Sequence, residues 1–218
     1  MPQSTGNSIS PAQRRSNQVK LLVLWLVPFG LMAIAGLCYY LVQTGQMTIG
    51  SKNHGVLLQP PVQLHDVLPG LQAYQGSVAP ASEDKEQLPW AGKWSIVVRG
   101  DAQCSRACRD NLYLTRQLHI RLDKNANRVQ RIYLSDAPTL GDEFVEHVAR
   151  EHLLLKSYRA QAASLLALDE KLVSGDGEPA RFFIVDPDGW AMMYYLQDHD
   201  GNAMLQDLKH LLKYSRER

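Results

Sequence analysis

Uncharged residues fill one long stretch near the start of the chain. Every position in residues 21–42 is uncharged, and most are hydrophobic. About 20 apolar residues are enough for a helix to cross the hydrocarbon layer of a membrane. A cleaved secretory signal has an apolar core of about 7 to 15 residues followed by small residues, whereas this run ends in Tyr-Tyr-Leu-Val. The pattern therefore predicts one retained transmembrane helix, over residues 19–43.

Basic residues flank this predicted span unequally. Arg14, Arg15 and Lys20 precede the uncharged run of residues 21–42, whereas only Lys52 follows it closely. Because cytoplasmic flanks of membrane helices carry the excess of Lys and Arg, we expect the N-terminus in the cytoplasm and the rest of the chain outside. Residues 1–18 are polar and lack hydrophobic periodicity, which predicts a disordered cytoplasmic tail.

Apolar periodicity is weak between the span and Trp90. Residues 44–89 hold several prolines, including the adjacent Pro60 and Pro61, and only short apolar stretches. Proline is confined to edge strands and extended segments because it has no N–H for a central ladder. We therefore expect a linker that runs extended along the domain surface and contributes an edge strand.

Short β-rich runs and amphipathic stretches alternate from Trp90 onward. The β-rich runs predict a strand after Gly92, a strand over residues 129–134, and a hairpin that closes at a Pro-Asp-Gly turn. Helices are predicted between and after them, over residues 104–125, 142–152, 165–172 and 202–214. The order strand, helix, strand, helix, hairpin, helix is typical of a three-layer α/β domain with a mixed sheet, over residues 90–218.

The size and charge of the chain narrow its possible functions. Its 218 residues are enough for one domain of ordinary size and an anchor. The formal net charge is +1, and no basic run is interleaved with aromatic residues, which excludes a nucleic-acid-binding protein. The sequence also has no nucleophile with an identifiable neighbouring base and no phosphate-binding glycine loop, so a hydrolase is not indicated.

Two cysteines lie at the start of the first helix predicted in the domain. Cys104 and Cys108 follow a buried strand and stand four residues apart. On one helix this spacing places the Cβ atoms about 5 to 6 Å apart, so the sulfurs can reach each other or one soft metal ion. The helix N-terminus, with Arg106 and Arg109, stabilises the thiolate that attacks disulfides and binds copper. A purely structural disulfide is the alternative, but an oxidising compartment favours a functional pair.

Several segments resemble the Sco/SenC proteins. Trp90, the Gly92-Lys93-Trp94 turn, the C-x-x-x-C spacing and residues 182–189 are similar to that family, over about residues 90–215 and the N-terminal anchor. The resemblance implies a thioredoxin-like periplasmic domain anchored in a bacterial inner membrane. It also implies a part in assembling the binuclear copper centre of cytochrome c oxidase. Residues 53–61 and 116–118 are similar to small membrane proteins associated with cytochrome oxidase operons of proteobacteria.

The sequence departs from Sco proteins at one copper ligand. Sco proteins bind copper with the two cysteines and a histidine, and Glu178 stands at the equivalent of that histidine. A carboxylate is a hard ligand, poorly suited to Cu(I). Two-coordinate Cu(I) on Cys104 and Cys108 stays open, and so does a third ligand from one of the seven histidines: His54, His65, His119, His147, His152, His199 and His210.

The missing histidine shifts weight toward thiol chemistry. Pro179 precedes a predicted strand much as the cis-proline of thioredoxin-like oxidoreductases precedes theirs, and such a proline keeps a backbone edge open for a partner segment. A trans proline that starts a strand is the alternative. In a redox-active pair we expect Cys104, as the more exposed cysteine, to attack and Cys108 to resolve.

Three functions stay open on this basis. The first is an assembly factor that acts by thiol–disulfide exchange on a cytochrome c oxidase subunit or on another oxidase assembly factor. The second is a Cu(I) metallochaperone of Sco type. The third is a scaffold without chemistry, in which Cys104 and Cys108 form a static disulfide. The first is the leading hypothesis.

Overall fold

The computed structural model describes residues 11–44, 53–74, 89–173, 177 and 179–215. The chain divides into two compact units, Met1–Lys52 and Asn53–Arg218.

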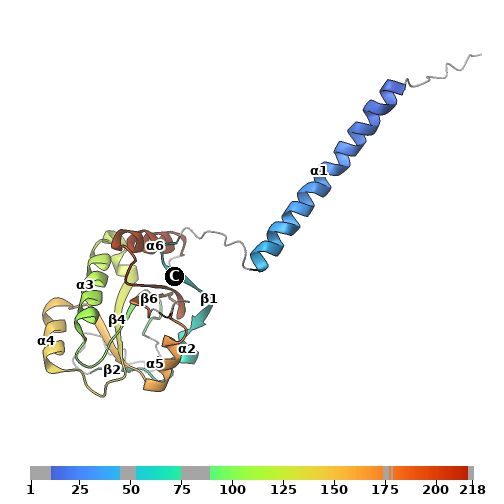
Figure 1. Cartoon of the computed structure of the whole chain (residues 1–218). Helices are drawn as coiled ribbons and strands as arrows, with labels where there is room; N and C mark the ends of the chain where they lie inside the picture. The colour runs from blue at the N-terminus through green and yellow to red at the C-terminus, as the bar shows by residue number, and fades with distance from the viewer. Residues whose placement is uncertain (1–10, 45–52, 75–88, 174–176, 178, 216–218) are drawn as a thin grey trace, which may run out of the picture. The chain divides into compact units, whose positions relative to one another are not determined.

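The first unit contains the helix α1, Pro11–Gln43 (Figure 1). Its segment Lys20–Leu41 has a mean hydropathy of 2.4 and is long and apolar enough to cross a membrane, as both anchors and signal sequences are. The helix begins earlier than expected, within the predicted tail, because proline is well suited to the first helical position. Residues 1–10 of that tail lie outside the described residues.

The second unit is built on a mixed sheet. Among the described residues the strands follow the order β1-β7-β6-β3-β4-β5-β2. The central strands β3, β4 and β5 are parallel, and the other neighbouring pairs are antiparallel. The bounds are β1 Val56–Gln63, β2 Gln72–Ala73, β3 Trp94–Arg99, β4 Val129–Ser135, β5 Leu155–Arg159, β6 Phe182–Val185 and β7 Trp190–Tyr195.

Helices cover both faces of this sheet. Successive residues of a strand point to opposite faces, so Ile96 and Val98 of β3 join one apolar cluster and Val97 joins the other. The first cluster packs α3, α4 and α6 on one face, and the second packs α2 and α5 on the other. The three-layer α/β plan with a mixed sheet is therefore confirmed. The helices are α2 Leu64–Val67, α3 Arg106–Ile120, α4 Asp142–Glu151, α5 Ala162–Asp169 and α6 Gly201–Tyr214, with a 3-10 turn η1 at Asp123–Arg128.

Residues 53–74 form the two edges of the sheet. The strand β1 pairs with β7 at one edge, and the short β2 pairs with β5 at the other. Pro60 and Pro61 are tolerated in β1 because an edge strand does not need every N–H for its ladder. The remainder of the expected linker, residues 75–88, lies outside the described residues.

A buried arginine ties the helix α3 to the strand β4. Arg131 lies on the same face of β4 as the apolar cluster beneath α3, and its guanidinium donates to the Leu112 carbonyl of α3 at 2.9 Å. A second contact, 3.2 Å long, reaches Nδ1 of the buried His152. Burial, and next the charge of Arg131, lower the pKa of His152 to about 4. His152 is therefore neutral in the folded domain and can accept this hydrogen bond.

A buried carboxylate ties the start of the domain to the helix α6. Asp207 accepts hydrogen bonds from the backbone N–H groups of His54, at 2.9 Å, and Gly55, at 2.9 Å. It also accepts from the hydroxyl of Tyr195 at 3.2 Å. The first residues of the second unit are thus fixed by a charge-assisted network rather than by apolar packing.

Acidification is expected to destabilise the second unit through His152. Its pKa is about 4 when folded and about 6.5 when unfolded, so the unfolded chain binds more protons between these values. The contribution, on the order of 3 kcal/mol, is present above about pH 6.5 and is lost as the pH falls toward 4. Chemical denaturation of the full chain in detergent across this range measures it.

The matched comparison is His152→Asn, which keeps an acceptor for Arg131 but does not titrate. The control is His210→Asn, at an exposed position of α6. We expect the free energy of unfolding of His152→Asn to change less with pH than that of the wild type or the control. An equal pH dependence in all three chains would contradict the role given to His152.

Substituting Asn for Asp207 is expected to lower the free energy of unfolding by about 2 kcal/mol. The amide has nearly the same shape, but it replaces one acceptor oxygen with a donor that faces the N–H groups of His54 and Gly55. Urea denaturation followed by tryptophan fluorescence gives the value. Asp66→Asn, at an exposed site on α2, is the control and should change stability by less than about 0.5 kcal/mol. Equal losses in the two variants would refute the role of the network.

Candidate functional site: a buried disulfide at the end of a central strand

The two domain cysteines form a disulfide at the carboxyl end of β3. The strand ends at Arg99, a loop follows, and Cys104 and Cys108 are bonded with their Cα atoms 5.2 Å apart. β3 lies between the parallel β4 and the antiparallel β6. In α/β sheets, binding and reaction sites gather beyond the carboxyl ends of the strands.

Only one of the two cysteines belongs to the helix. Ser105 is the N-cap of α3, and its hydroxyl accepts a hydrogen bond from the backbone N–H of Cys108 at 3.4 Å. Cys104 therefore precedes the helix, with a φ of +51° in the left-handed region that few non-glycine residues adopt. The expectation that both cysteines share one helix face is wrong for Cys104. The reason is that serine is the stronger N-cap and begins the helix after it.

Both cysteines are buried. Cys104 is 1% exposed and Cys108 is 6% exposed, and both belong to the apolar cluster beneath α3 and α4. The expectation that Cys104 is the more exposed cysteine is therefore wrong. A thiol has to approach one sulfur directly to exchange with it. Attack on this buried disulfide therefore requires the residues around it to move.

Gly100 and Tyr133 lie close to the sulfur of Cys108. A Cβ atom added to Gly100 would lie 2.7 Å from the Cys108 sulfur and would collide with the Tyr133 hydroxyl, so only glycine fits. The Tyr133 hydroxyl donates to the Asp101 carbonyl at 2.5 Å and lies 3.9 Å from the Cys108 sulfur. Burial, and next Asp101, raise the pKa of Tyr133, so its hydroxyl stays protonated.

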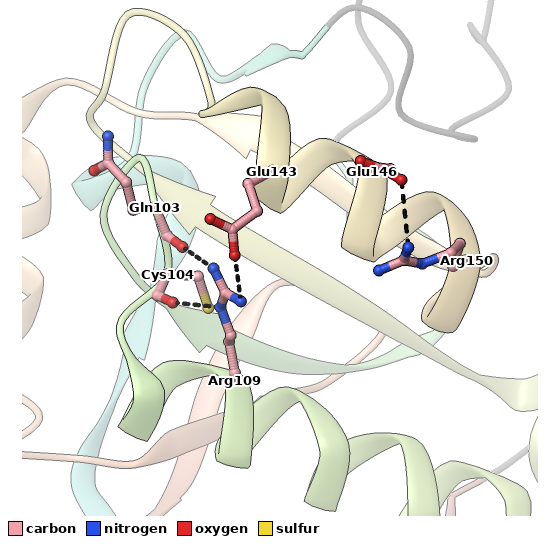
Figure 2. A network of polar contacts seen from close by, with 6 residues as sticks. All are labelled: Gln103, Cys104, Arg109, Glu143, Glu146 and Arg150. Atoms are coloured by element: carbon pink, nitrogen blue, oxygen red, sulfur yellow. Dashed lines mark hydrogen bonds and ion pairs between the residues drawn. The ribbon is translucent and has the colours of Figure 1, made fainter.

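An arginine spans the loop and the neighbouring helix, as Figure 2 shows. Arg109 of α3 donates from Nε to the Cys104 carbonyl at 3.1 Å and from a terminal nitrogen to the Gln103 carbonyl at 3.4 Å. Its other terminal nitrogen pairs with Glu143 of α4 at 3.0 Å. One side chain thus contacts the loop before the helix and a second helix at the same time.

A charged cavity of about 380 Å³ has Gly100 in its lining. Arg99 and Asp169 form an ion pair in its lining, and Asp101 and Asp136 lie in the same lining. Pro179 also lines this cavity and forms an isolated bridge with Val173. The structure therefore places Pro179 and Gly100, the neighbour of the Cys108 sulfur, in the lining of one cavity.

The isomer of the bond before Pro179 remains a prediction. That bond joins Pro179 to Glu178, and Glu178 lies outside the described residues. The position that corresponds to the Sco histidine is for the same reason outside the described part of the chain.

The described residues do not supply a three-ligand copper site. Reduction of the disulfide would give two thiolates, but no group of three or more His, Cys, Asp or Glu side chains gathers anywhere in the described ranges. The imidazole of His119 is engaged with the carbonyls of Ala126 and Val129, and that of His152 with Arg131. A Sco-type ligand set therefore does not fit the described part of the site.

Three residues of this site were not identified from the sequence. Tyr133 and Glu143 lie on β4 and α4, far from the cysteines along the chain, and only the tertiary fold brings them close. Gly100 carried a readable signal, because a glycine between a buried strand and a cysteine pair often marks a close approach of another group. Arg109 was noted only for its charge.

Comparison with solved structures finds several proteins of similar fold at low identity. Copper-bound Sco1 from yeast is 16% identical, covering 58% of this chain and 82% of its own, with a TM-score of 0.47. BsSco, a member of the Sco family of cytochrome c oxidase assembly proteins, is 13% identical over 75% of this chain and 97% of its own, with a TM-score of 0.45. A thiol:disulfide interchange protein from Bacteroides sp. is 16% identical over 59% and 78%, with a TM-score of 0.40.

One family model matches the domain that holds the disulfide. No curated protein matches the chain. The model described as "Transmembrane-like, thioredoxin-like, C-terminal domain" matches residues 94–215, which confirms the thioredoxin-like fold expected from the sequence. Because the matched residues make up more than half of the chain, it belongs to this family of transmembrane-like proteins with a thioredoxin-like C-terminal domain.

Proposed function

We propose that this chain is a thiol–disulfide exchange protein, anchored in a bacterial inner membrane with its domain in the periplasm. Its client is a cytochrome c oxidase subunit or another oxidase assembly factor. The observation that carries the proposal is the Cys104–Cys108 disulfide at the N-terminus of α3, beside the carboxyl end of β3. A helix N-terminus stabilises a thiolate, which is the attacking form of a cysteine. The Sco/SenC resemblance supports the choice of client, and the same resemblance together with the apolar helix α1 supports the membrane anchor.

The exchange transfers two electrons from the reduced domain to an oxidised client. A Cys104 thiolate attacks one sulfur of the client disulfide, so that a mixed disulfide forms and one client thiolate leaves. Cys108 then attacks the Cys104 sulfur, which restores the domain disulfide and releases the second client thiolate. The two protons of the domain thiols pass to the solvent and to the client. A further thiol reductant must return the domain to its dithiol form.

Cys104 is the better candidate for the attacking cysteine even though both cysteines are buried. It lies on the loop before α3 and can move outward without unwinding the helix. Cys108 lies in the first turn, where its backbone N–H is held by Ser105. This difference in attachment, rather than exposure, assigns the two roles.

A static disulfide is the second candidate, and burial of both sulfurs favours it. In that case the domain binds an oxidase subunit through its surface and the disulfide only stabilises the loop. The metallochaperone alternative would rest on Cys104 and Cys108 alone among the described residues. It predicts a tight, cysteine-dependent one-to-one site when Cu(I) is titrated into the reduced full chain.

Cys108→Ser is expected to trap a mixed disulfide with the client, because the attacking Cys104 remains but nothing resolves it. The full chain carries the change in a Cys38→Ser background, since Cys38 is a free cysteine in α1. The probe is an oxidised oxidase-subunit domain with its copper-binding cysteines, and non-reducing gels measure the adduct. Cys104→Ser in the same background is the matched control and should trap much less. Equal and negligible trapping by both variants would favour the static disulfide.

Replacing both Cys104 and Cys108 by serine is expected to abolish the support of oxidase assembly in cells while the chain remains folded. Oxidase activity of membranes from a strain that carries only this variant is the readout, and circular dichroism of the purified chain checks the fold. Cys38→Ser should behave like the wild type. A folded double variant that still supports full oxidase assembly would identify the domain as a scaffold.

A further inference from the structure

Arg109 contacts the segment that carries Cys104 at two points. Cys104 and Gln103 both direct their carbonyl groups at its guanidinium, at 3.1 and 3.4 Å. This segment is the loop of residues 101–104, which we call the 101–104 loop. Cys104 is its last residue and is only 1% exposed, so a thiol can reach this sulfur only when the loop moves.

The guanidinium is itself held from the opposite side. Glu143 of α4 pairs with it at 3.0 Å, so that Figure 2 shows Arg109 lying between the loop and α4. Glu143 is 82% exposed and Arg109 is 34% exposed, and an exposed ion pair of this kind contributes little stability. The contact can therefore open without unfolding the domain.

We propose that Arg109, oriented by Glu143, is a positioning residue that keeps the 101–104 loop closed over the disulfide and so sets the rate of thiol exchange. The inference deepens the proposed function and rests on it. Arg109 donates to backbone carbonyls and to Glu143 and contacts neither sulfur through a hydrogen bond. It acts through the loop that carries Cys104.

The shape of the side chain, rather than its charge alone, carries the role. A guanidinium presents several N–H donors in a fixed plane and can serve three acceptors at once. Lysine has a single nitrogen on a flexible stem and cannot hold Gln103, Cys104 and Glu143 together in this arrangement. Arg109→Lys therefore keeps the charge but loses this arrangement of donors. It distinguishes an arginine that holds the loop closed from one that only stabilises a thiolate electrostatically.

The helix α4 offers a matched control for Glu143. Glu146 and Arg150 form an exposed ion pair at 3.3 Å, one turn apart on the same helix. In Figure 2 this pair lies along α4, away from the loop and from Arg109. Glu146→Gln thus removes a carboxylate from the same helix without touching the loop.

The experiment measures reduction of the oxidised full chain in detergent by excess dithiothreitol, in the Cys38→Ser background. One thiolate of dithiothreitol attacks one sulfur of the disulfide and releases the other as a thiolate. The second thiol of dithiothreitol then displaces the remaining domain sulfur, so that oxidised dithiothreitol and two domain thiols result. Maleimide labelling of quenched samples gives the rate. The equilibrium with a dithiothreitol redox buffer gives the reduction potential.

We expect Arg109→Ala and Arg109→Lys to accelerate reduction roughly three- to tenfold, because charge-assisted contacts to the loop are lost. Glu143→Gln should accelerate it by a smaller factor, about twofold, since an amide still accepts a hydrogen bond. Glu146→Gln should react at the wild-type rate. The reduction potential should stay unchanged in all variants, because in this proposal the loop is a barrier to access, and lowering such a barrier speeds the forward and reverse reactions equally.

Several results would overturn the inference. One is reduction of Arg109→Ala at the wild-type rate. Another is a faster reduction in Arg109→Ala but a wild-type rate in Arg109→Lys. The third is a shift of the reduction potential that accounts for the faster reaction. If Arg109→Ala does not fold, Glu143→Gln against Glu146→Gln still decides the question. Dithiothreitol replaces the client here, so failure of client trapping and failure of the loop mechanism are distinguishable.

Discussion

The covalent bond between Cys104 and Cys108 fixes how the loop that leaves β3 meets α3, and the surrounding side chains are arranged to permit it. Ser105 begins the helix between them, so one sulfur is carried by a loop and the other by a helical turn. Gly100 leaves room for the Cys108 sulfur against β4. Arg131, buried on β4, holds the Leu112 carbonyl of the same helix. The position of the bond therefore depends on contacts from the neighbouring strand β4 as well as on the strand that the loop leaves.

Burial protects the disulfide from unrelated thiols, but it also hinders its reaction with a client. In an oxidising compartment a sealed disulfide resists exchange with unrelated thiols, but a client is excluded in the same way. The site resolves this conflict only if the covering loop opens at modest cost. Cys104 stands in a left-handed backbone conformation, and carbonyl groups of its loop accept hydrogen bonds from Arg109, which is paired with the exposed Glu143. Such ties break locally more easily than a packed core does.

The sequence was sufficient for the centre of the domain and insufficient for its margins. The short apolar runs that became β3 and β6 predict buried strands, because every one of their inner positions faces a helix layer. The strand β5, Leu155–Arg159, carries Lys and Arg beside its apolar residues, and its pattern does not stand out from a loop. The cysteine pair was located correctly after a central strand. The residues that surround it could not be found, since Tyr133 and Glu143 reach it only through strand pairing and helix packing.

Thiol exchange and copper transport both need the sulfurs of Cys104 and Cys108, and the two sulfurs cannot serve both at the same time. Cu(I) requires both cysteines as thiolates, whereas a disulfide has no lone thiolate to offer. Within the described residues the pair is oxidised. Around it lie a neutral tyrosine, a glycine and an arginine directed at backbone carbonyls, and no third soft ligand. An arginine that faced the sulfurs would favour thiolates, and one that faces the loop favours a closed cover. The orientation of Arg109 thus favours a domain whose chemistry is controlled by access to the disulfide rather than by affinity for a metal.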